Sequence, residues 1–312
     1  MKFSYIISAA ACLTLAAIVP VQAQAPAGPA ITVRQATVND PGYPVIPVAI
    51  FAPANGSALP LVVISHGTGA SMISHIDTAQ ALANAGFVVV APMHPGDNFQ
   101  DDSAVGKPQW FVDRSRHVSK VIDFMTAQWE GHDRLAPNGI GLFGLSAGAT
   151  TALISVGGNP DLAGVPAYCA RTPEFVCKIM GPPAASPADA PPMTTDKRVA
   201  AVVLAAPGLG FAFAPSGLAN VTVPVQLWTG EADNTVPTAT NAAVVRELLT
   251  TPVDYHSVPG AAHLSFLAPC GPDSPPFICK DPDGFDRAAF HQKFNQSIIA
   301  FFNKHLRAQR PE

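Results

Sequence analysis

Charged residues are scarce in this chain of 312 residues. Only 13% of the residues are Asp, Glu, Lys or Arg, whereas 48% are hydrophobic, and the formal net charge is −4. The chain has no long run of one charge and no internal repeat. Without a basic region we expect no nucleic-acid partner. The low charge and high apolar content suit a sheet that is buried on both faces.

Long apolar runs are also lacking beyond the first residues. Lys2 precedes an apolar run from Ile6 to Pro20, and Val21-Gln22-Ala23 follows it. This order is typical of a secretory signal peptide, because the run is too short for a membrane anchor, the alternative reading. We place the cleavage after Ala23, since cleavage after Ala25 would leave a proline at the new end. We therefore expect an exported protein, periplasmic or secreted, with no stable membrane span once residues 1–23 are removed.

Cysteine is sparse, and its positions agree with export. Cys12 lies in the signal peptide, which leaves two local pairs that each bracket a loop containing proline. In an oxidising compartment we expect Cys169–Cys177 and Cys270–Cys279 disulfides, although four cysteines allow three connectivities. No C-x-x-C or H-E-x-x-H spacing is present, so we expect no metal site.

Apolar runs and amphipathic segments alternate along most of the chain. Two early strands without helices, followed by strands and helices in turn, predict an α/β fold with a mostly parallel sheet that begins with a hairpin. Helices are expected at 74–85, 110–128, 147–156, 239–249 and 285–306. Eight strands are expected at 31–36, 45–51, 61–65, 87–91, 139–143, 199–205, 223–228 and 253–258.

One segment interrupts this alternation. Residues 157–198 contain eight prolines and the first pair of cysteines. The segment is too long for a simple connection, and it lies between the elements nearest the candidate nucleophile described below. We interpret it as a proline-rich lid or cap insertion within a single domain of residues 24–312; a tolerated surface excursion is the alternative.

A short turn suggests the chemistry. Gly144-Leu145-Ser146-Ala147-Gly148 follows a buried strand and opens a helix of small residues. In this context G-x-S-x-G is typical of a strained turn that exposes a serine hydroxyl, with glycines where side chains would collide with the neighbouring strand and helix. We therefore take Ser146 as the candidate nucleophile.

An acid and a base follow in the chain order that α/β-hydrolases use. Asp233 comes after the seventh predicted strand and His263 after the eighth. The carboxyl ends of parallel strands share one edge of a sheet, so these side chains should meet Ser146 there. His263 would take the serine proton, and Asp233 would fix the imidazole. Glu231 is a rival for the acid, but it lies closer to the strand.

Backbone donors for an oxyanion are expected from two places. One is the N–H of Ala147, at a helix N-terminus. The other lies in the glycine-rich loop after the third strand, with Thr68 as first choice and Gly67 as second. We assign His66 to the shape of this loop. His94, after the fourth strand, is a candidate for lining the substrate pocket.

Several stretches together resemble the exported bacterial α/β-hydrolases of the dienelactone-hydrolase-like group, relatives of platelet-activating-factor acetylhydrolase. They are residues 64–69, 91–97, 144–148, 230–237 and 259–270, and the resemblance extends from about Val45 to His305. It implies an α/β-hydrolase fold with helices on both faces of the sheet. Dienelactone hydrolases themselves use a cysteine where Ser146 stands, so lactone specificity does not follow. The acetylhydrolases place their acid after strand six, where residues 204–208 contain no carboxylate, and this strengthens Asp233.

These features predict a serine esterase that cleaves carboxylic esters of small molecules through an acyl-enzyme and needs no cofactor. The same residues would serve a lipase, a thioesterase or an amidase. A catalytically inactive hydrolase fold used for binding is the alternative from another class. A haloalkane dehalogenase is excluded, because it needs a carboxylate where Ser146 stands.

Overall fold

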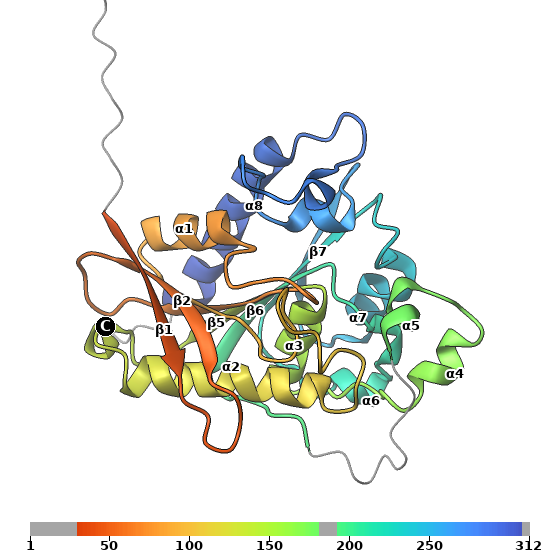
Figure 1. The fold of residues 1–312 in the computed structure, drawn as a ribbon, viewed down its shortest axis with the longest axis horizontal. Helices are drawn as coiled ribbons and strands as arrows, with labels where there is room; N and C mark the ends of the chain where they lie inside the picture. The colour runs from red at the N-terminus through yellow and green to blue at the C-terminus, as the bar shows by residue number, and fades with distance from the viewer. Residues whose placement is uncertain (1–29, 181–191, 308–312) are drawn as a thin grey trace, which may run out of the picture.

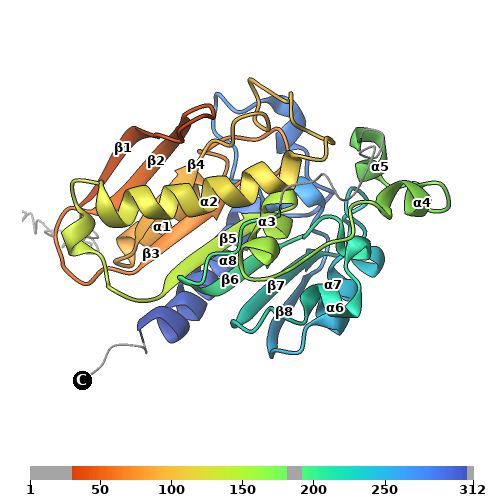
Figure 2. The ribbon, with the colours of Figure 1, turned by 90° about the horizontal axis from the view of Figure 1, so that it is seen from below.

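A computed structural model describes residues 30–180 and 192–307 of the chain, and the expected signal peptide lies outside these residues. One sheet of eight strands runs through the molecule in the order β1-β2-β4-β3-β5-β6-β7-β8 (Figures 1 and 2). The strands are β1 (Ile31–Val38), β2 (Ile46–Pro53), β3 (Leu61–Ser65), β4 (Val88–Pro92), β5 (Ile140–Leu145), β6 (Val199–Ala205), β7 (Val225–Gly230) and β8 (Val253–Val258).

Strand directions follow the predicted pattern. β1 pairs antiparallel with β2, and β2 pairs antiparallel with β4, whereas every pair from β4 to β8 is parallel. The central strands β3, β4 and β5 are buried at every position, because helices cover both of their faces. The predicted eight-stranded, mostly parallel sheet that starts with a hairpin is therefore confirmed.

Helices form a layer on each face of this sheet (Figure 2). Apolar residues of α2 (Trp110–Ala127), α3 (Ala147–Ser155) and α7 (Ala242–Leu248) pack on one face, together with the short α6 (Pro215–Leu218). On the other face lie α1 (Ile76–Asn84) and α8 (Arg287–Phe302). On α2 the expected stripe of Val118, Val121, Ile122 and Met125 is fully buried, which confirms its amphipathic pattern.

The described part of the insertion contains two short helices, α4 (Val165–Cys169) and α5 (Phe175–Ile179). They project from the edge of the molecule beside α7 (Figure 1). Two contacts join them to the body: Tyr168 stacks on Phe211 at 3.7 Å between ring centroids, and Glu174 accepts a hydrogen bond of 3.0 Å from Asn241. Val165 is buried in one apolar cluster with Trp110 and Ala147. The described part of the insertion therefore packs beside the helix that begins at Ala147.

Both expected disulfides are present. Cys169–Cys177 joins the end of α4 to α5, and Cys270–Cys279 closes the loop that follows His263. Of the three possible connectivities, the structure thus has the local one that the spacing favoured.

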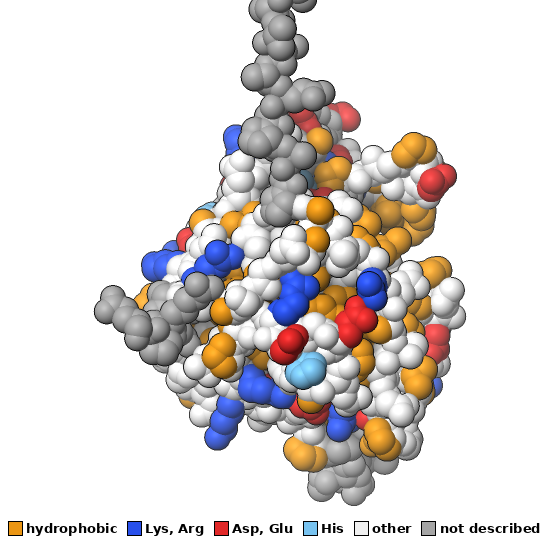
Figure 3. Space-filling view, turned by 90° about the vertical axis from the view of Figure 1, so that its left-hand side faces the viewer, with side chains coloured by type: hydrophobic (Ala, Val, Ile, Leu, Met, Phe, Trp, Pro, Cys, Tyr) orange, Lys and Arg blue, Asp and Glu red, His pale blue; other side chains and the backbone are white. Residues whose placement is uncertain are grey.

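The surface carries charges of both signs. On the face turned to the viewer in Figure 3, acidic and basic side chains are interspersed among apolar and neutral ones. Among residues 30–180 and 192–307, no helix combines the length and the apolar character needed to cross a bilayer.

Candidate active site

Ser146 occupies a strained turn between β5 and α3. Its backbone has φ 56° and ψ −119°, a conformation that residues other than glycine rarely adopt. The flanking glycines make the turn possible, because a Cβ at Gly144 would lie 2.2 Å from the carbonyl group of Gly148, and one at Gly148 would lie 2.0 Å from the Ser65 oxygen. These are the collisions with helix and strand that the sequence predicted.

Asp233 and His263 meet at the same edge of the sheet, beyond β7 and β8. The Nδ1 atom of His263 lies 2.7 Å from Oδ2 of Asp233, and both side chains are buried. The other carboxylate oxygen of Asp233 accepts the N–H groups of Thr235 and Val236, at 2.9 and 2.8 Å. These bonds fix the position of the Asp233 carboxylate. Because Asp233 contacts His263 through Nδ1, the Nε2 atom of the ring takes no part in that contact.

Glu231, the rival candidate for the acid, makes a different contact. Its side chain is exposed and accepts a hydrogen bond of 2.9 Å from Ser257. After β6 the chain continues as Ala206-Pro207-Gly208, and the N–H of Gly208 donates to the Ser146 carbonyl at 3.3 Å. The position after β6, where the acetylhydrolases place their acid, is therefore occupied here by backbone that lies beside Ser146. Of these positions, only Asp233 contacts His263 in the structure.

Ser146 follows β5 and His263 follows β8, at the same edge of the sheet, and no hydrogen bond joins their side chains in the described structure. The Ser146 side chain is half-buried. A contact between nucleophile and base is often loose before a substrate binds and tightens in the reactive complex. The arrangement brings the side chains of Asp233 and His263 together.

The backbone N–H groups of Gly67, Thr68 and Ala147 lie near Ser146 and have no protein acceptor within the described residues. A Cβ at Gly67 would lie 3.5 Å from the Cβ of Ser146, so this loop touches the serine directly. Ala147 opens α3, where helix geometry leaves the first N–H groups free. The two segments that were expected to supply oxyanion donors thus flank Ser146.

His66 shapes the glycine-rich loop, as the sequence suggested. Its Nε2 accepts the backbone N–H of His94 at 3.1 Å, so the proton must lie on Nδ1. That Nδ1–H donates to the Gly67 carbonyl at 2.7 Å. Burial, followed by the Arg114 guanidinium, lowers the pKa of His66 to about 3, so the ring is neutral at pH 7.

His94, the candidate pocket residue, lies inside the protein instead. It has no exposed surface, its Nε2 contacts the Ser65 hydroxyl at 2.9 Å, and its Nδ1 faces His117 at 3.3 Å. Burial, and then Arg114, hold the pKa of His94 well below its usual value. Its position after β4 is at the correct edge of the sheet, but the side chain turns inward to support the loop.

Sequence reasoning missed a buried ion pair next to this loop. Arg114 of α2 is 1% exposed and pairs with the equally buried Asp97, which follows β4. Trp110 donates its indole N–H to the same carboxylate at 2.6 Å. A signal was present, because Arg114 precedes Val118 by four residues and Val121 by seven, and therefore falls on the apolar stripe of α2.

A second polar network holds the turn that carries His263. The Ser265 hydroxyl accepts the N–H of Ala262 at 3.0 Å and donates to Asp281 at 2.7 Å, and Arg287 binds Asp281 through two nitrogens. His291 contacts the Ser265 carbonyl at 3.0 Å from the other side. The loop between residues 268 and 284 thus braces the turn through Asp281.

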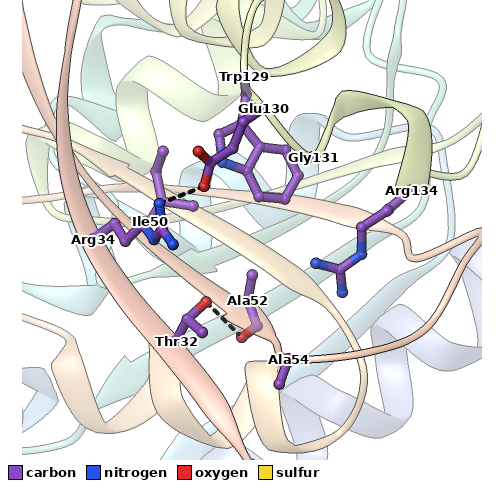
Figure 4. Close-up of a pocket in the computed structure, with 9 residues that line it drawn as sticks. All are labelled: Thr32, Arg34, Ile50, Ala52, Ala54, Trp129, Glu130, Gly131 and Arg134. Carbon is purple, nitrogen blue, oxygen red and sulfur yellow. Dashed lines mark hydrogen bonds and ion pairs between the residues drawn. The ribbon is translucent and has the colours of Figure 1, made fainter.

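A cavity of about 420 Å³ lies elsewhere, beside β1 and β2 (Figure 4). Trp129, Arg134 and the exposed Arg34–Glu130 ion pair line it, and it includes none of Ser146, Asp233 or His263. Among the described residues, no cluster of three His, Cys, Asp or Glu side chains is arranged to hold a metal ion.

Sheet order, helix layers and the serine turn after β5 define an α/β-hydrolase fold. The chain is similar in structure to a dienelactone hydrolase from Anabaena variabilis ATCC 29413, with a TM-score of 0.55 and 18% sequence identity over 88% of this chain and 98% of that one. No protein-family model matches the chain, and no curated protein matches it in sequence.

Proposed function

We propose that the protein is a serine hydrolase that cleaves carboxylic esters, with Ser146 as nucleophile, His263 as base and Asp233 as its orienting acid. The observation that carries the proposal is the 2.7 Å contact between His263 Nδ1 and Asp233, at the sheet edge where Ser146 stands in a strained turn. Fold similarity to a hydrolase supports the same class of reaction.

In the first half of the reaction the Ser146 oxygen attacks the ester carbonyl carbon, and its proton passes to Nε2 of His263. Asp233 accepts the Nδ1–H throughout and stabilises the imidazolium without taking the proton. When the tetrahedral intermediate collapses, His263 returns the proton to the departing alcohol. Water then attacks the acyl-enzyme by the same route and releases the acid and free Ser146.

The negative charge on the carbonyl oxygen needs two donors. We assign them to the N–H groups of Thr68 and Ala147, with Gly67 as the alternative on the loop side. All three lack a protein acceptor within the described chain, and they belong to the segments that flank Ser146. Loss of one such donor typically costs about 10²–10³ in rate.

Residues 157–198 would act as a lid. Their described part supports this role, because Val165, Val176 and Met180 join the apolar cluster that includes Ala147 and Trp110. An acyl or alkyl group bound beside Ala147 would therefore approach side chains of the insertion. Ester chain length is the substrate property that this segment would control, so a series of esters separates a short-chain esterase from a lipase.

Export is part of the proposal. The two disulfides suit an oxidising compartment, and residues 1–23 have the order of a signal peptide. Expression in a bacterial host followed by mass determination of the exported protein tests this. A mature chain that begins at Gln24 is expected, and a retained Met1 would contradict export by this signal.

The decisive experiment compares wild type with Ser146→Ala on a short p-nitrophenyl ester. Turnover should fall by about 10⁴-fold or more, because the nucleophile is lost. Ser119→Ala is the matched control, since that hydroxyl binds Asp196 away from the site. Retention of most of the wild-type turnover by Ser146→Ala would reject the proposal.

A fluorophosphonate probe separates this enzyme from an inactive binding protein of the same fold. The probe should label wild type, but not the Ser146→Ala variant. A wild-type protein that stays unlabelled and turns over no ester would favour the binding role. Thioesters and anilides, assayed beside the oxygen esters, rank thioesterase and amidase activity at the same site.

A further inference from the structure

Arg114 connects four segments that meet behind Ser146. Its Nη1 binds Asp97, its Nη2 binds the carbonyl of His66 and lies 3.2 Å from the Ser65 hydroxyl, and its Nε binds the Thr151 hydroxyl at 3.0 Å. A buried charge is costly unless it is paired and hydrogen-bonded, and this guanidinium meets both conditions. One side chain thereby links α2, the end of β3, the loop after β4 and α3.

On one side, the Arg114–Asp97 pair holds the loop that carries Thr68. Arg114 binds the His66 carbonyl, and Oδ1 of Asp97 accepts the N–H of Gly69 at 2.7 Å. The peptide between Gly67 and Thr68 lies between these two anchors. Its carbonyl accepts the Nδ1–H of His66, so the Thr68 N–H on the same peptide points the opposite way.

On the other side, the same guanidinium reaches the start of α3. The Thr151 hydroxyl that accepts from Arg114 donates in turn to the carbonyl of Ala147, at 2.8 Å. Ala147 carries the second free N–H beside Ser146. Arg114 therefore touches the loop of one donor directly and the residue of the other donor through a single hydroxyl.

We propose that Arg114 is a positioning residue that sets the spacing between the N–H groups of Thr68 and Ala147, with Asp97 as the partner that fixes its guanidinium. The inference rests on the proposed serine hydrolysis, because it assigns these N–H groups to the oxyanion. It adds a residue of α2 to those that position the two oxyanion donors. None of its hydrogen bonds is to Ser146, so Arg114 would act on the transition state through the two donors.

The fork geometry of arginine makes a conservative test possible. Arg114→Lys keeps the positive charge but cannot reach His66, Asp97 and Thr151 together. We expect kcat to fall about 10- to 100-fold while KM changes less than about two-fold, since only a transition-state interaction weakens. Arg116→Lys, on the same helix, is the control: Arg116 pairs with Asp40 and Asp113 instead, and kcat should stay near wild type.

A second pair of variants leaves the buried charge of Arg114 in place. Thr151→Val removes the hydroxyl between Arg114 and Ala147, and Thr151→Ser keeps it. We expect Thr151→Val to lower kcat about 10-fold and Thr151→Ser to restore most of it. Thermal unfolding and circular dichroism of each variant identify those that are folded at the assay temperature.

An alkyl trifluoromethyl ketone provides a readout that loss of stability alone would not move. It forms a hemiketal oxyanion on an active serine, so its inhibition constant should rise by about the same factor as kcat falls. Folded Arg114→Lys and Thr151→Val variants with wild-type kcat and inhibitor affinity would overturn the inference. So would a loss confined to KM. If Ser146→Ala remains active, the proposed function fails first, and that outcome is distinct from both.

Discussion

Asp233→Asn tests the assignment of the acid most directly, because the substitution changes one atom of the contact. The amide oxygen can replace Oδ1 and keep the N–H bonds of Thr235 and Val236. The amide nitrogen would replace Oδ2, 2.7 Å from His263 Nδ1. An NH₂ group donates, so Nδ1 must become the acceptor and the ring proton moves to Nε2. In that tautomer His263 cannot take the proton of Ser146.

The expected loss is about 10⁴ in kcat, which is the scale found when a buried orienting aspartate becomes asparagine and the geometry survives. At 1.36 kcal/mol per tenfold, this corresponds to about 5.5 kcal/mol in the barrier. The thermal midpoint should change far less, since two of the three bonds remain.

Glu231→Gln is the matched control for this measurement. Glu231 is two residues away, and its exposed carboxylate binds Ser257. A surface substitution of this kind changes energies by about 0.5 kcal/mol at most, so kcat/KM should stay within about two-fold. Steady-state hydrolysis of a p-nitrophenyl ester at several pH values provides the comparison. An Asp233→Asn enzyme with a tenth of wild-type kcat, or an equal loss in Glu231→Gln, would refute the assignment.

Further predictions concern the lid, pH and the serine turn. Replacing Cys169 and Cys177 by serine removes the disulfide that closes a loop with a sequence separation of 8. The loss should destabilise the α4–α5 segment by about 2–3 kcal/mol. Faster proteolysis of that segment and a raised KM for long-chain esters would show it. Burial, followed by Arg116 and Arg114, lowers the pKa of His117 to about 3. Between pH 6.5 and 3 the unfolded chain therefore binds a proton at His117 that the folded chain excludes. The free energy of unfolding falls by about 1.4 kcal/mol per pH unit as the solution is acidified. In urea unfolding of His117→Asn, the dependence of this free energy on pH should be smaller by that amount. Gly148→Ala should not fold, because its Cβ would lie 2.0 Å from the Ser65 oxygen, whereas Gly271→Ala, with nothing within 4 Å, should melt like wild type.

The strands and most helices could be predicted because their signals are local. Continuous apolar runs mark buried parallel strands, and all eight expected strands are present. Helix ends were less exact: α1 begins at Ile76 rather than 74, and α8 ends at Phe302, after which the backbone widens into a π-helical turn. Ends depend on caps and on packing, which periodicity does not report.

The contact of His263 with Asp233, and not with Glu231, was predictable for a related reason. Both follow β7, but the turn must bring a carboxylate across to the residue that follows β8. Glu231 still pairs with the end of β8, where its N–H donates to the Val258 carbonyl. Two residues later the chain has left the ladder, and Asp233 can reach His263. Distance from the strand end therefore carried the information.

The inward turn of His94 and the burial of Arg114 were not predicted, because both depend on long-range contacts. His94 meets Ser65 and His117, which are 29 and 23 residues away in the chain. An arginine on an apolar stripe usually extends its charge to solvent. Here Arg114 pairs instead with Asp97, which lies in the loop after β4, and no local sequence pattern predicts that pairing.

The scarcity of charge gives meaning to the charges that are buried. Removing an ion from water costs several kcal/mol, so a pair that only filled space could be replaced by apolar residues at no loss. At the carboxyl edge of the sheet lie the fully buried Arg114–Asp97 pair and the partly buried Arg287–Asp281 pair. The first holds the loop of Thr68, and the second reaches the turn of His263 through Ser265. Each fixes a loop whose backbone would otherwise be free to shift, and a directional, charge-assisted bond does this where apolar packing cannot.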